Sequence, residues 1–433
     1  MKNLIQKILA FLAKQVLYKY QPKVVGITGS MGKTSSKEAI YSVLSSKFNV
    51  RRNIKNYNNE IGVPLTIIGE PSGLRSIVRW LMIFWKAFEL LIFRDKNYPE
   101  ILVLEMGADR PGDIKYLVNI APCDIGILTT IAPVHVEFFK DIKGVIKEKK
   151  KIITHLKQDK LAILNRDDIN VWNIHEESKA RVLGFGFEEG ADVRAIEVMN
   201  KFIPDSERPE EEVAGTSFKL VYGGNAVPVT LPAVLGRAHV YAALVGAAAG
   251  IHFGMNMVDI ANALKEYEAP RGRMRIVKGI KNTWLLDDTY NASPLATLAA
   301  VNALSELEVF ESGRRWAVLG DMLELGSFTE KGHADVGKRA GSLGIDFLVT
   351  VGERAKDIAK AAIDAGIPED HVYYFNSSPE AGRFLQDKIH ENDILLIKGS
   401  QGMRMEHIVK ELMAEPLRAG EMLCRQDETW LKK

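Results

Sequence analysis

Short apolar runs and longer amphipathic stretches alternate along most of this chain. Apolar runs of four to eight residues are typical of strands buried in a parallel sheet, and amphipathic stretches of helices that cover its faces. Two such series follow one another, and Ala269–Arg273 (Ala-Pro-Arg-Gly-Arg) is predicted to be a hinge between them. The pattern predicts an α/β protein in three parts, an N-terminal amphipathic helix at 1–20, a central domain at 21–270 and a second domain at 271–433.

The individual elements follow from the same pattern. Strands are expected to end in polar residues, because the carboxyl ends of strands in open α/β sheets are where ligands bind. An irregular, charged surface segment is expected at 187–215. The expected strands are at 24–27, 101–105, 124–131, 161–164, 284–287, 316–321, 346–351 and 393–397, paired strands span 216–232 around a Gly223-Gly224 turn, and helices are expected at 33–47, 140–153, 238–250 and 256–267.

The first of these strands leads into a glycine-rich loop, Thr28–Thr34 (Thr-Gly-Ser-Met-Gly-Lys-Thr), which opens an amphipathic helix. Backbone N–H groups of such a loop, at a helix N-terminus, cradle phosphate oxygens. Lys33 is expected to reach the β- and γ-phosphates, and the Thr34 hydroxyl to hold Mg²⁺. Ile27 stands where the general pattern has glycine, so a plain strand–helix turn is the alternative. The residues predicted to bind nucleotide here are Gly29, Ser30, Met31, Gly32, Lys33 and Thr34.

Glu105 ends the buried-type run Ile101–Glu105. A carboxylate at the carboxyl end of a strand lies where ligands bind, and carboxylate oxygens are ligands that Mg²⁺ prefers. Glu105 is therefore a candidate magnesium ligand, directly or through water. The alternative is a capping or ion-pair role. The asparagine-rich stretch at 56–64 is expected to be a loop whose amides offer donors and acceptors.

The helix expected at 140–153 carries six lysines. At about 100° per residue, five of them share one face, as in a solvated surface, while Lys149 points the opposite way among isoleucines and valine. A lysine in apolar surroundings is costly unless it is modified or paired. Lys149 is therefore singled out, together with His135 in the preceding loop, which by itself could be an ordinary loop histidine.

Two further segments, 3–20 and 74–93, are amphipathic in an unusual way. In 74–93 the four charges fall within roughly 80° of one another on a helix, and the rest of its surface is apolar with two tryptophans. Three charges inside the run count against a membrane-spanning helix. Two interpretations stay open for each segment: contact with a membrane interface, or packing against this chain or a partner.

Composition narrows the class of protein. A length of 433 residues, 46% hydrophobic and 26% charged residues are ordinary for a globular chain of two or three domains. The net charge of +2 argues against a nucleic-acid binder. Two cysteines form neither a disulfide framework nor a thiolate metal site, and no secretory signal is visible, so a cytoplasmic location is expected, with peripheral contact at the inner membrane face.

Taken together and in order, these motifs resemble the Mur ligase family, which joins amino acids or peptides to the growing peptidoglycan stem. The resemblance is strongest to the MurF-like branch, which adds D-alanyl-D-alanine, and it runs from residue 23 to about 410. It implies a central P-loop ATPase domain with a mostly parallel sheet, followed by a Rossmann-like α/β C-terminal domain. The segments that carry it are 28–34, 58–66, 105–108, 287–294, 319–326 and 398–400.

The resemblance also implies roles for single residues, with ATP and Mg²⁺ as cofactors. Lys33, His135 and Lys149 match catalytic positions. Thr34 and Glu105 match magnesium ligands, His135 matches the histidine of a second metal site, and Lys149 matches a lysine that is carbamylated in related ligases. The remaining matches are Asp288 and Asn291, in the region that grips adenine and ribose, and Arg273, the hinge arginine that approaches the nucleotide.

Three departures from the family pattern limit what is carried over. Gly236-Arg237-Ala238-His239 stands where the family has Gly-Arg-His-Asn, and Ser293 stands where an asparagine is usual. The phosphate loop begins at Thr28, so the N-terminal domain that binds the uridine nucleotide in MurF-like proteins has no counterpart in this sequence. The acceptor is therefore left open: it could be UDP-linked, lipid-linked or of another kind.

The function implied by the resemblance is ATP-dependent amide-bond synthesis for peptidoglycan precursors. A muropeptide-type carboxylate would be activated as an acyl phosphate and attacked by an amino acid or a dipeptide such as D-alanyl-D-alanine. Two alternatives stay open: another amino-acid ligase similar to folylpolyglutamate synthase, and a non-catalytic ATP-binding partner at the membrane. ADP release that depends on an added amine separates an enzyme from a binder.

Overall fold

The computed structural model describes residues 2–54, 57–132, 139, 141–201, 215–309, 312–427 and 430. The chain divides into two compact units, each built on its own sheet. The first unit comprises residues 1–197, 218–229 and 240–268, and the second comprises 198–217, 230–239 and 269–433. The three-part division predicted from the sequence stays a prediction.

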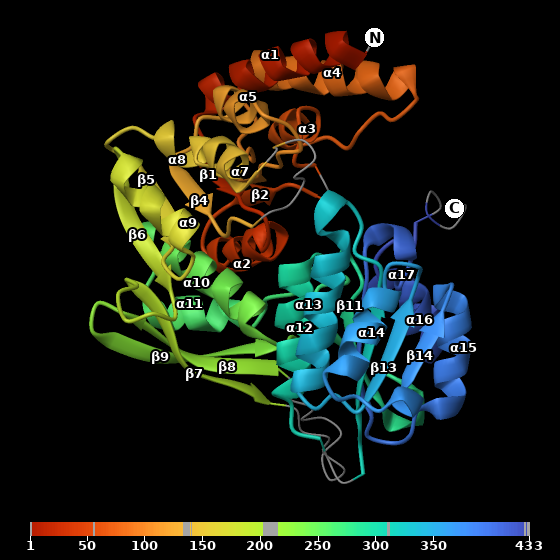
Figure 1. The fold of residues 1–433 in the computed structure, drawn as a ribbon. Coiled ribbons are helices and arrows are strands. Elements are labelled where there is room, and N and C mark those ends of the chain that lie inside the picture. Colours follow the sequence, from red (N-terminus) through yellow and green to blue (C-terminus); the bar gives the residue numbers. More distant parts are fainter. Residues whose placement is uncertain are drawn as a thin grey trace. The chain divides into compact units, whose positions relative to one another are not determined.

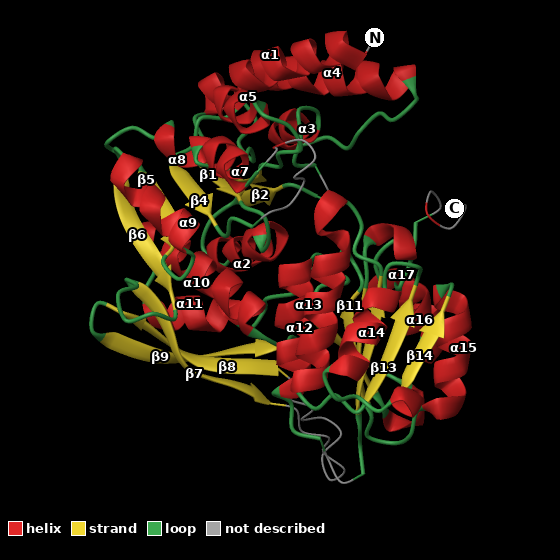
Figure 2. Ribbon diagram, in the orientation of Figure 1, coloured by secondary structure: helices red, strands yellow, loops and turns green. Residues whose placement is uncertain are grey.

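The first unit is built on a nine-stranded sheet in the order β2-β3-β1-β4-β5-β6-β7-β8-β9, whose last three strands also contain residues assigned to the second unit (Figure 2). From β2 to β7 the neighbouring strands are parallel. Because β1 lies between β3 and β4, the loops that follow these three strands meet at one edge. The strands are β1 Lys23–Thr28, β2 Val50–Arg52, β3 Ile101–Glu105, β4 Ile125–Leu128, β5 Leu161–Asn165, β6 Arg181–Gly186, β7 Val193–Lys201, β8 Gly215–Tyr222 and β9 Asn225–Pro232.

Helices cover both faces of the parallel part of this sheet (Figure 1). One face carries α2 (Lys33–Ser45), against which α10 (Arg237–His252) and α11 (Met257–Leu264) pack. The other face carries α3 (Gly62–Ile68), α5 (Asp113–Ile120), α7 (Ile142–Lys149) and α8 (Lys151–Thr154), with α1 (Lys2–Tyr20) and α4 (Ile77–Ile92) packed over them. The short α9 (Ile169–Trp172) follows β5.

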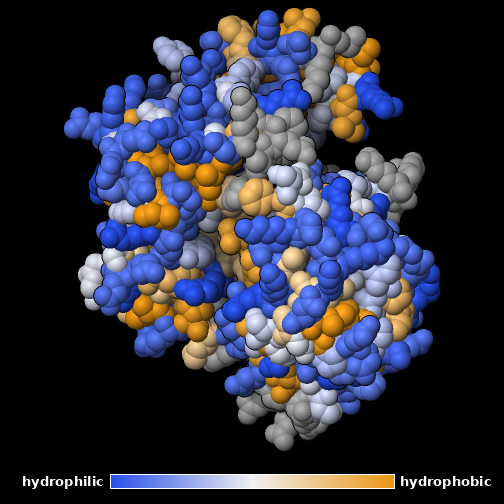
Figure 3. Space-filling view, in the orientation of Figure 1, coloured by the Kyte–Doolittle hydropathy of each residue, from blue (hydrophilic) through white to orange (hydrophobic). Residues whose placement is uncertain are grey.

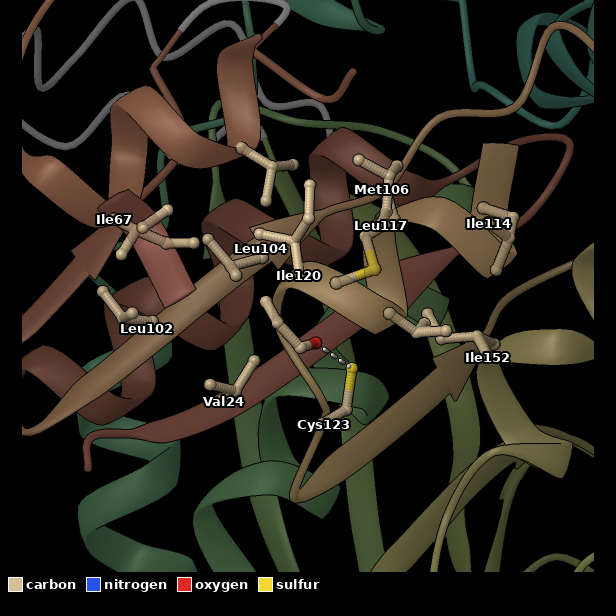
Figure 4. Packing of buried hydrophobic residues seen from close by; sticks show 14 of the residues in the cluster. Val24, Ile67, Leu102, Leu104, Met106, Ile114, Leu117, Ile120, Cys123 and Ile152 are labelled. Atoms are coloured by element: carbon tan, nitrogen blue, oxygen red, sulfur yellow. Dashed lines mark hydrogen bonds between the residues drawn. The ribbon is translucent and has the colours of Figure 1, made fainter. Parts of the chain in front are cut away.

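The core of the first unit lies between the sheet and the second of these helix layers. Figure 4 shows Val24, Leu102 and Leu104 of the sheet facing Ile67 of α3 and Leu117 of α5. Alternate residues of each strand point to the same face, so Val25 and Ile27 belong to the opposite side, toward α2. This two-sided burial explains why the strands are continuous apolar runs in the sequence.

The second unit is a three-layer α/β/α sandwich. Its sheet has the order β10-β11-β15-β12-β13-β14, parallel except for β10, with bounds β10 Arg275–Lys278, β11 Trp284–Asp288, β12 Arg315–Gly320, β13 Phe347–Val351, β14 Val372–Phe375 and β15 Ile394–Lys398. Two separate hydrophobic clusters fill the space on its two faces. One face carries α12 Pro294–Ser305, α13 Thr329–Ser342 and α14 Lys356–Asp364, and the other carries α15 Ser378–Lys388, α16 Glu406–Leu412 and α17 Ala419–Met422.

Two predictions about local structure were wrong. The segment 187–215, expected to be irregular, contains β7, because its buried Val193 and Ala195 alternate with polar residues in a pattern that the neighbouring charges obscure. The loop expected at 56–64 ends earlier than predicted: Gly62–Pro64 form the first turn of α3, where the Asn59 side chain accepts hydrogen bonds from the N–H groups of Ile61 and Gly62. Proline is tolerated in a first helical turn because its missing N–H has no partner there.

Candidate active site

The loop between β1 and α2 has the geometry of a phosphate-binding loop. Gly32 lies at φ 80°, a left-handed conformation that favours glycine, and it caps the N-terminus of α2. A Cβ atom at Gly29 would lie 2.0 Å from Oγ1 of Thr129, so only glycine lets the loop approach β4 this closely. The N-terminus of α2 carries the positive end of the helix dipole, which favours a bound phosphate.

The strand neighbouring β1 on one side holds this loop in place. Thr129 and Thr130, directly after β4, both donate their hydroxyl groups to the carbonyl oxygen of Met31, at 2.5 and 3.1 Å. Ser30 donates its N–H to the carbonyl of Thr130 at 2.7 Å, and its hydroxyl accepts the N–H of Ala132 at 2.9 Å. The loop is therefore fixed before any ligand binds, which lowers the entropy cost of binding.

On the other side of β1, Thr34 and Glu105 lie in direct contact. The Thr34 hydroxyl donates to Oε2 of Glu105 at 3.0 Å, and the Asn58 amide donates to Oε1 at 3.0 Å. Glu105 is at the carboxyl end of β3, paired with Ile27 of β1, and is only 4% exposed. The structure therefore brings together the two residues proposed as magnesium ligands.

The chemistry of this pair fits a magnesium ion. Both side chains offer hard oxygen ligands, and Mg²⁺ is commonly held by one or two protein oxygens together with water and substrate phosphates. No cluster of three or more His, Cys, Asp or Glu suited to a metal occurs among the residues that the structure describes. An ion held at Thr34 and Glu105 would thus need further ligands from phosphate and water.

Two lysines converge on the phosphate loop. The carbonyl oxygen of Gly29 accepts hydrogen bonds from Nζ of Lys33 at 2.7 Å and from Nζ of Lys149 at 3.0 Å, although the two lysines are far apart in the sequence. Lys149 is 3% exposed, and burial, followed by the nearby charge of Lys33, lowers its pKa to about 7. An amine of this kind is partly unprotonated, and therefore nucleophilic, at neutral pH.

The helical pattern of lysines predicted for 140–153 agrees with the structure where it is described. Lys143 and Lys147 of α7 are exposed and Lys150 forms an ion pair with Glu177, whereas Lys149 faces inward. The inward side also holds Glu148, which was not predicted. Its carboxylate accepts the backbone N–H groups of Gly112 and Ile114, at the start of α5. That contact fixes α7, and with it Lys149, against the rest of the unit.

His135, predicted to belong to a second metal site, lies outside the described residues. Sequence reasoning also missed Lys37, which lies close to Glu105. Lys37 is 1% exposed, donates to the carbonyl of Asn53 at 2.9 Å and lies 4.0 Å from Oε2 of Glu105. Lys37 follows Lys33 by four residues, about one helical turn, so both lie on the same face of the helix. This spacing is the feature of the sequence that could have placed Lys37 near the phosphate loop.

In the second unit, the predicted nucleotide residues gather at the carboxyl ends of β11 and β15. Nζ of Lys398 donates to Oδ2 of Asp288 at 2.6 Å and to the backbone carbonyl of Asn291 at 3.0 Å. Lys398 and Asp288 are both buried, while Asn291 is exposed. The structure thus connects Asp288 to Asn291 through a lysine that had a place in the sequence motif but no predicted role.

Arg273 lies beside the same segment. Its guanidinium is 4.2 Å from the ring centroid of Tyr290, and its backbone carbonyl is 2.9 Å from Nε2 of His239. Full burial lowers the pKa of His239 to about 4, so this imidazole is neutral and can donate its one N–H to that carbonyl. The preceding Gly272 lies at φ 70°, and its carbonyl accepts the N–H of Tyr290 at 3.0 Å. These contacts fix the hinge arginine within its own unit.

Replacing Lys398 with methionine is expected to lower the free energy of unfolding of the second unit by about 3–5 kcal/mol, because it leaves the Asp288 carboxylate buried without its partner. Urea denaturation measures this. Lys331→Met, at an exposed position on α13, is the matched control and is expected to change stability by less than about 0.5 kcal/mol. Adding Asp288→Asn to Lys398→Met should restore most of the loss. Equal effects of Lys398→Met and Lys331→Met would contradict the proposed role of the pair.

Comparisons with known proteins agree with this geometry. The Mur ligase middle domain matches residues 27–74 and 87–250, and the Mur ligase glutamate ligase domain matches residues 272–401. The UDP-N-acetylmuramoyl-tripeptide–D-alanyl-D-alanine ligase of Escherichia coli K12 is 30% identical over 93% of this chain and 79% of its own length. The chain belongs to the Mur ligase family.

Other members of the family are similar over the same extent. The corresponding ligase of Bacillus subtilis 168 is 29% identical over 94% of this chain and 79% of its own length. The crystal structure of MurF ligase from Thermotoga maritima in complex with ADP superimposes with a TM-score of 0.74 at 26% identity, covering 94% of this chain and 83% of that chain. Residues 75–86, which include the first ten residues of α4, and residues 1–26, which include α1, lie outside the matched Mur ligase domains.

Membership of the Mur ligase family confirms several predictions. The predicted fold class, a P-loop domain followed by a Rossmann-like α/β domain, is correct, and so is the predicted class of enzyme, an ATP-dependent ligase that uses Mg²⁺. The roles of the single residues stay predictions, although the structure places Thr34 with Glu105, and Lys33 with Lys149.

Proposed function

We propose that this chain is an ADP-forming ligase that joins D-alanyl-D-alanine, or a closely similar amine, to a muropeptide acceptor during synthesis of peptidoglycan precursors. The observation that carries the proposal is the convergence, at one edge of the first sheet, of the phosphate loop, the Thr34–Glu105 pair and the two lysines at Gly29. The names of the similar ligases supply the acceptor and amine.

The reaction has two steps. A carboxylate oxygen of the acceptor attacks the γ-phosphorus of ATP, the bond to the β-phosphate oxygen breaks, and ADP leaves with an acyl phosphate remaining. The amine then attacks the acyl carbon, the bond to phosphate breaks, and the amine gives up one proton as the amide forms. Phosphoryl transfer of this kind depends mainly on positioning and charge stabilisation.

Different residues of this chain are proposed to bind the phosphates and to hold the metal ion. Backbone N–H groups of Gly29–Lys33 bind phosphate oxygens at the α2 N-terminus, and Lys33 places its positive charge on the γ-phosphate. Thr34 and Glu105 are the residues that would hold Mg²⁺, and Asn58 keeps Glu105 oriented. When bound, the metal ion neutralises charge that develops on the phosphate oxygens. Lys149, once carbamylated, would add a further carboxylate-like ligand.

Asp288, Asn291 and Arg273 are proposed to form the nucleoside site, with Asn291 and Arg273 in contact with the nucleoside and Asp288 positioning the loop that carries Asn291. Asn291 is exposed and offers both an amide donor and a carbonyl acceptor, which suits the edge of an adenine base. The guanidinium of Arg273 carries a fixed positive charge beside the aromatic ring of Tyr290. The contacts of Lys398 with Asp288 and with the backbone carbonyl of Asn291 would hold the loop after β11, which carries Asn291, in place.

The predicted peripheral contact of segments 3–20 and 74–93 with the inner membrane face, in an otherwise cytoplasmic enzyme, is also part of this proposal. It would bring a lipid-linked acceptor within reach.

Phosphate release measured with purified protein tests the ligase proposal. UDP-linked and lipid-linked muropeptides are each supplied with and without D-alanyl-D-alanine, and L-glutamate replaces the dipeptide as a control amine. Release is expected only when acceptor and D-alanyl-D-alanine are both present. Release with glutamate alone as the amine would favour an enzyme similar to folylpolyglutamate synthase, and ATP binding without turnover in every mixture would favour a non-catalytic partner.

A further inference from the structure

One face of α4 is apolar and open to solvent. Seven large apolar side chains of this helix are each more than half exposed, Trp85 most of all at 75%. Five of them, all except Ile77 and Ile92, line a groove of about 650 Å³ together with Phe84, Glu70, Lys86 and Glu89. This α4 surface consists of Ile77, Val78, Leu81, Met82, Trp85, Phe88 and Ile92.

The exposure of this face is not a sign of a loosely attached helix. The opposite face of α4 buries Ile83, Ala87 and Leu90 in the core of the first unit. At its C-terminus, Nζ of Lys19 donates to the carbonyls of Leu90, Leu91 and Phe93, each at 2.9 Å. The last turn is thereby capped from α1. The helix is apolar on two sides, and only one of them is used for folding.

α1, like α4, has both buried and exposed apolar side chains. It packs beside α4, as Figure 1 shows, and buries Leu9, Leu12 and Val16. Its outer side exposes Leu4 and Phe11. Hydrophobic side chains accordingly appear at the upper edge of Figure 3, where Figure 1 places these two helices. Exposed apolar surface of this extent marks an interaction site rather than ordinary surface.

Charge is distributed unevenly around this surface. Residues 2–20 and 74–97 together contain nine lysines and arginines but only two acidic residues, whereas the rest of the chain contains 48 basic and 53 acidic residues. The exposed Arg79 of α4 and Arg75, just before the helix, border the apolar face, and Lys86 lies beside them in an ion pair with Glu89 at 3.2 Å. An apolar helix face flanked by basic side chains is the pattern of helices that lie in the interface of an anionic membrane.

We infer that the α4 surface, together with the outer side of α1, docks this ligase on the surface of an anionic lipid bilayer. The helix would lie in the plane of the membrane, with Leu81, Trp85 and Phe88 in the headgroup boundary and the arginines at the phosphates. It does not span the bilayer: sixteen residues reach about 24 Å, and none of the described helices is long and apolar enough to cross.

A second copy of the chain fits this surface less well. A symmetric dimer brings the same patch of both copies together, so the basic residues around each α4 surface would face one another. Like charges placed opposite each other across an interface are unfavourable. Anionic lipid headgroups, by contrast, neutralise that charge. α1 and residues 77–86 of α4 lie outside the matched Mur ligase domains.

Flotation with liposomes tests the inference. The full chain is expected to float with vesicles of phosphatidylglycerol and phosphatidylcholine, and much less with phosphatidylcholine alone or in about 0.5 M NaCl. Leu81→Ser, Trp85→Ser and Phe88→Ser combined should reduce the bound fraction by about tenfold or more. Trp80 and Phe84 are left unchanged, because both are half-buried and contact each other on the folded side.

The matched control replaces three exposed apolar residues elsewhere, Ile169, Val258 and Leu417, with serine. This variant should float like the wild type. Thermal melting shows whether both variants keep the fold. If the wild type stays soluble with anionic vesicles at low salt, or if both triple variants lose binding equally, the inference is wrong. A wild-type dimer that the α4 variant dissociates, with no flotation, would assign the surface to a second copy instead.

This inference does not rest on the ligase proposal, because flotation involves neither ATP nor acceptor. Phosphate release with a UDP-linked acceptor should be unchanged in the α4 variant, whereas release with a lipid-linked acceptor in vesicles should fall together with binding. If the enzyme is active but does not float, the docking inference is wrong and the ligase proposal stands. If the protein floats but is inactive, the ligase proposal is wrong and the docking inference stands.

Discussion

Replacing Lys33 with alanine is expected to abolish ATP turnover while the fold stays intact. Lys33 lies in the first turn of α2, and its Nζ already points back to the loop carbonyl of Gly29 at 2.7 Å. Removing a charge aimed at the group where negative charge develops typically costs about 10²–10³-fold in rate, and this one also contributes to phosphate binding. Phosphate release with acceptor and D-alanyl-D-alanine measures the loss.

Lys47→Ala is the control for this prediction. Lys47 follows the other end of α2 and is exposed, so its loss removes the same charge without touching the phosphate loop. Its activity and melting temperature should match those of the wild type. Alanine also favours helix, so the Lys33 variant should melt normally. Near-normal phosphate release in the Lys33 variant would remove the central assumption about the loop.

The parts of the site that the sequence predicted are those built from local geometry. A strand, a glycine-rich loop and a helix are consecutive, so Lys33 and Thr34 are placed by the backbone that carries them. Predicting the position of Glu105 required one further rule, that the carboxyl ends of parallel strands lie at the same edge of a sheet. The inward direction of Lys149 followed from helical periodicity, and the structure agrees with it.

The parts that could not be predicted depend on contacts between segments far apart. Nothing in the sequence pairs Asn58 with Glu105, or Lys398 with Asp288, because each pair forms only when the sheets assemble. The open face of α4 shows the same limit. Its periodicity revealed a narrow charged stripe, but only the structure separates the buried side from the exposed one.

Lys149→Ala is expected to lose activity, because the proposed carbamate would supply a carboxylate at the phosphate site. In the unmodified protein, Lys149 and Lys33 direct two amines at one carbonyl oxygen, and the charge of Lys33 is one cause of the lowered pKa of Lys149. Addition of CO₂ to Nζ, with loss of one proton, turns this repulsion into an attraction between carbamate and ammonium. Activity of the variant should recover partly with added acetate, which replaces the missing carboxylate.

Lys147→Ala is the matched control, since Lys147 lies on the same helix but is exposed, and its activity should be normal without acetate. Carbon-13 NMR of protein equilibrated with labelled bicarbonate gives a readout that does not depend on turnover: a carbamate signal is expected in the wild type and in Lys147→Ala but not in Lys149→Ala. A buried amine whose pKa is lowered to about 7 is partly free to react at neutral pH, which favours Lys149 as the site of the carbamate. Full activity of Lys149→Ala without acetate, or the same carbamate signal in all three proteins, would leave Lys149 with only its hydrogen bond to the phosphate loop.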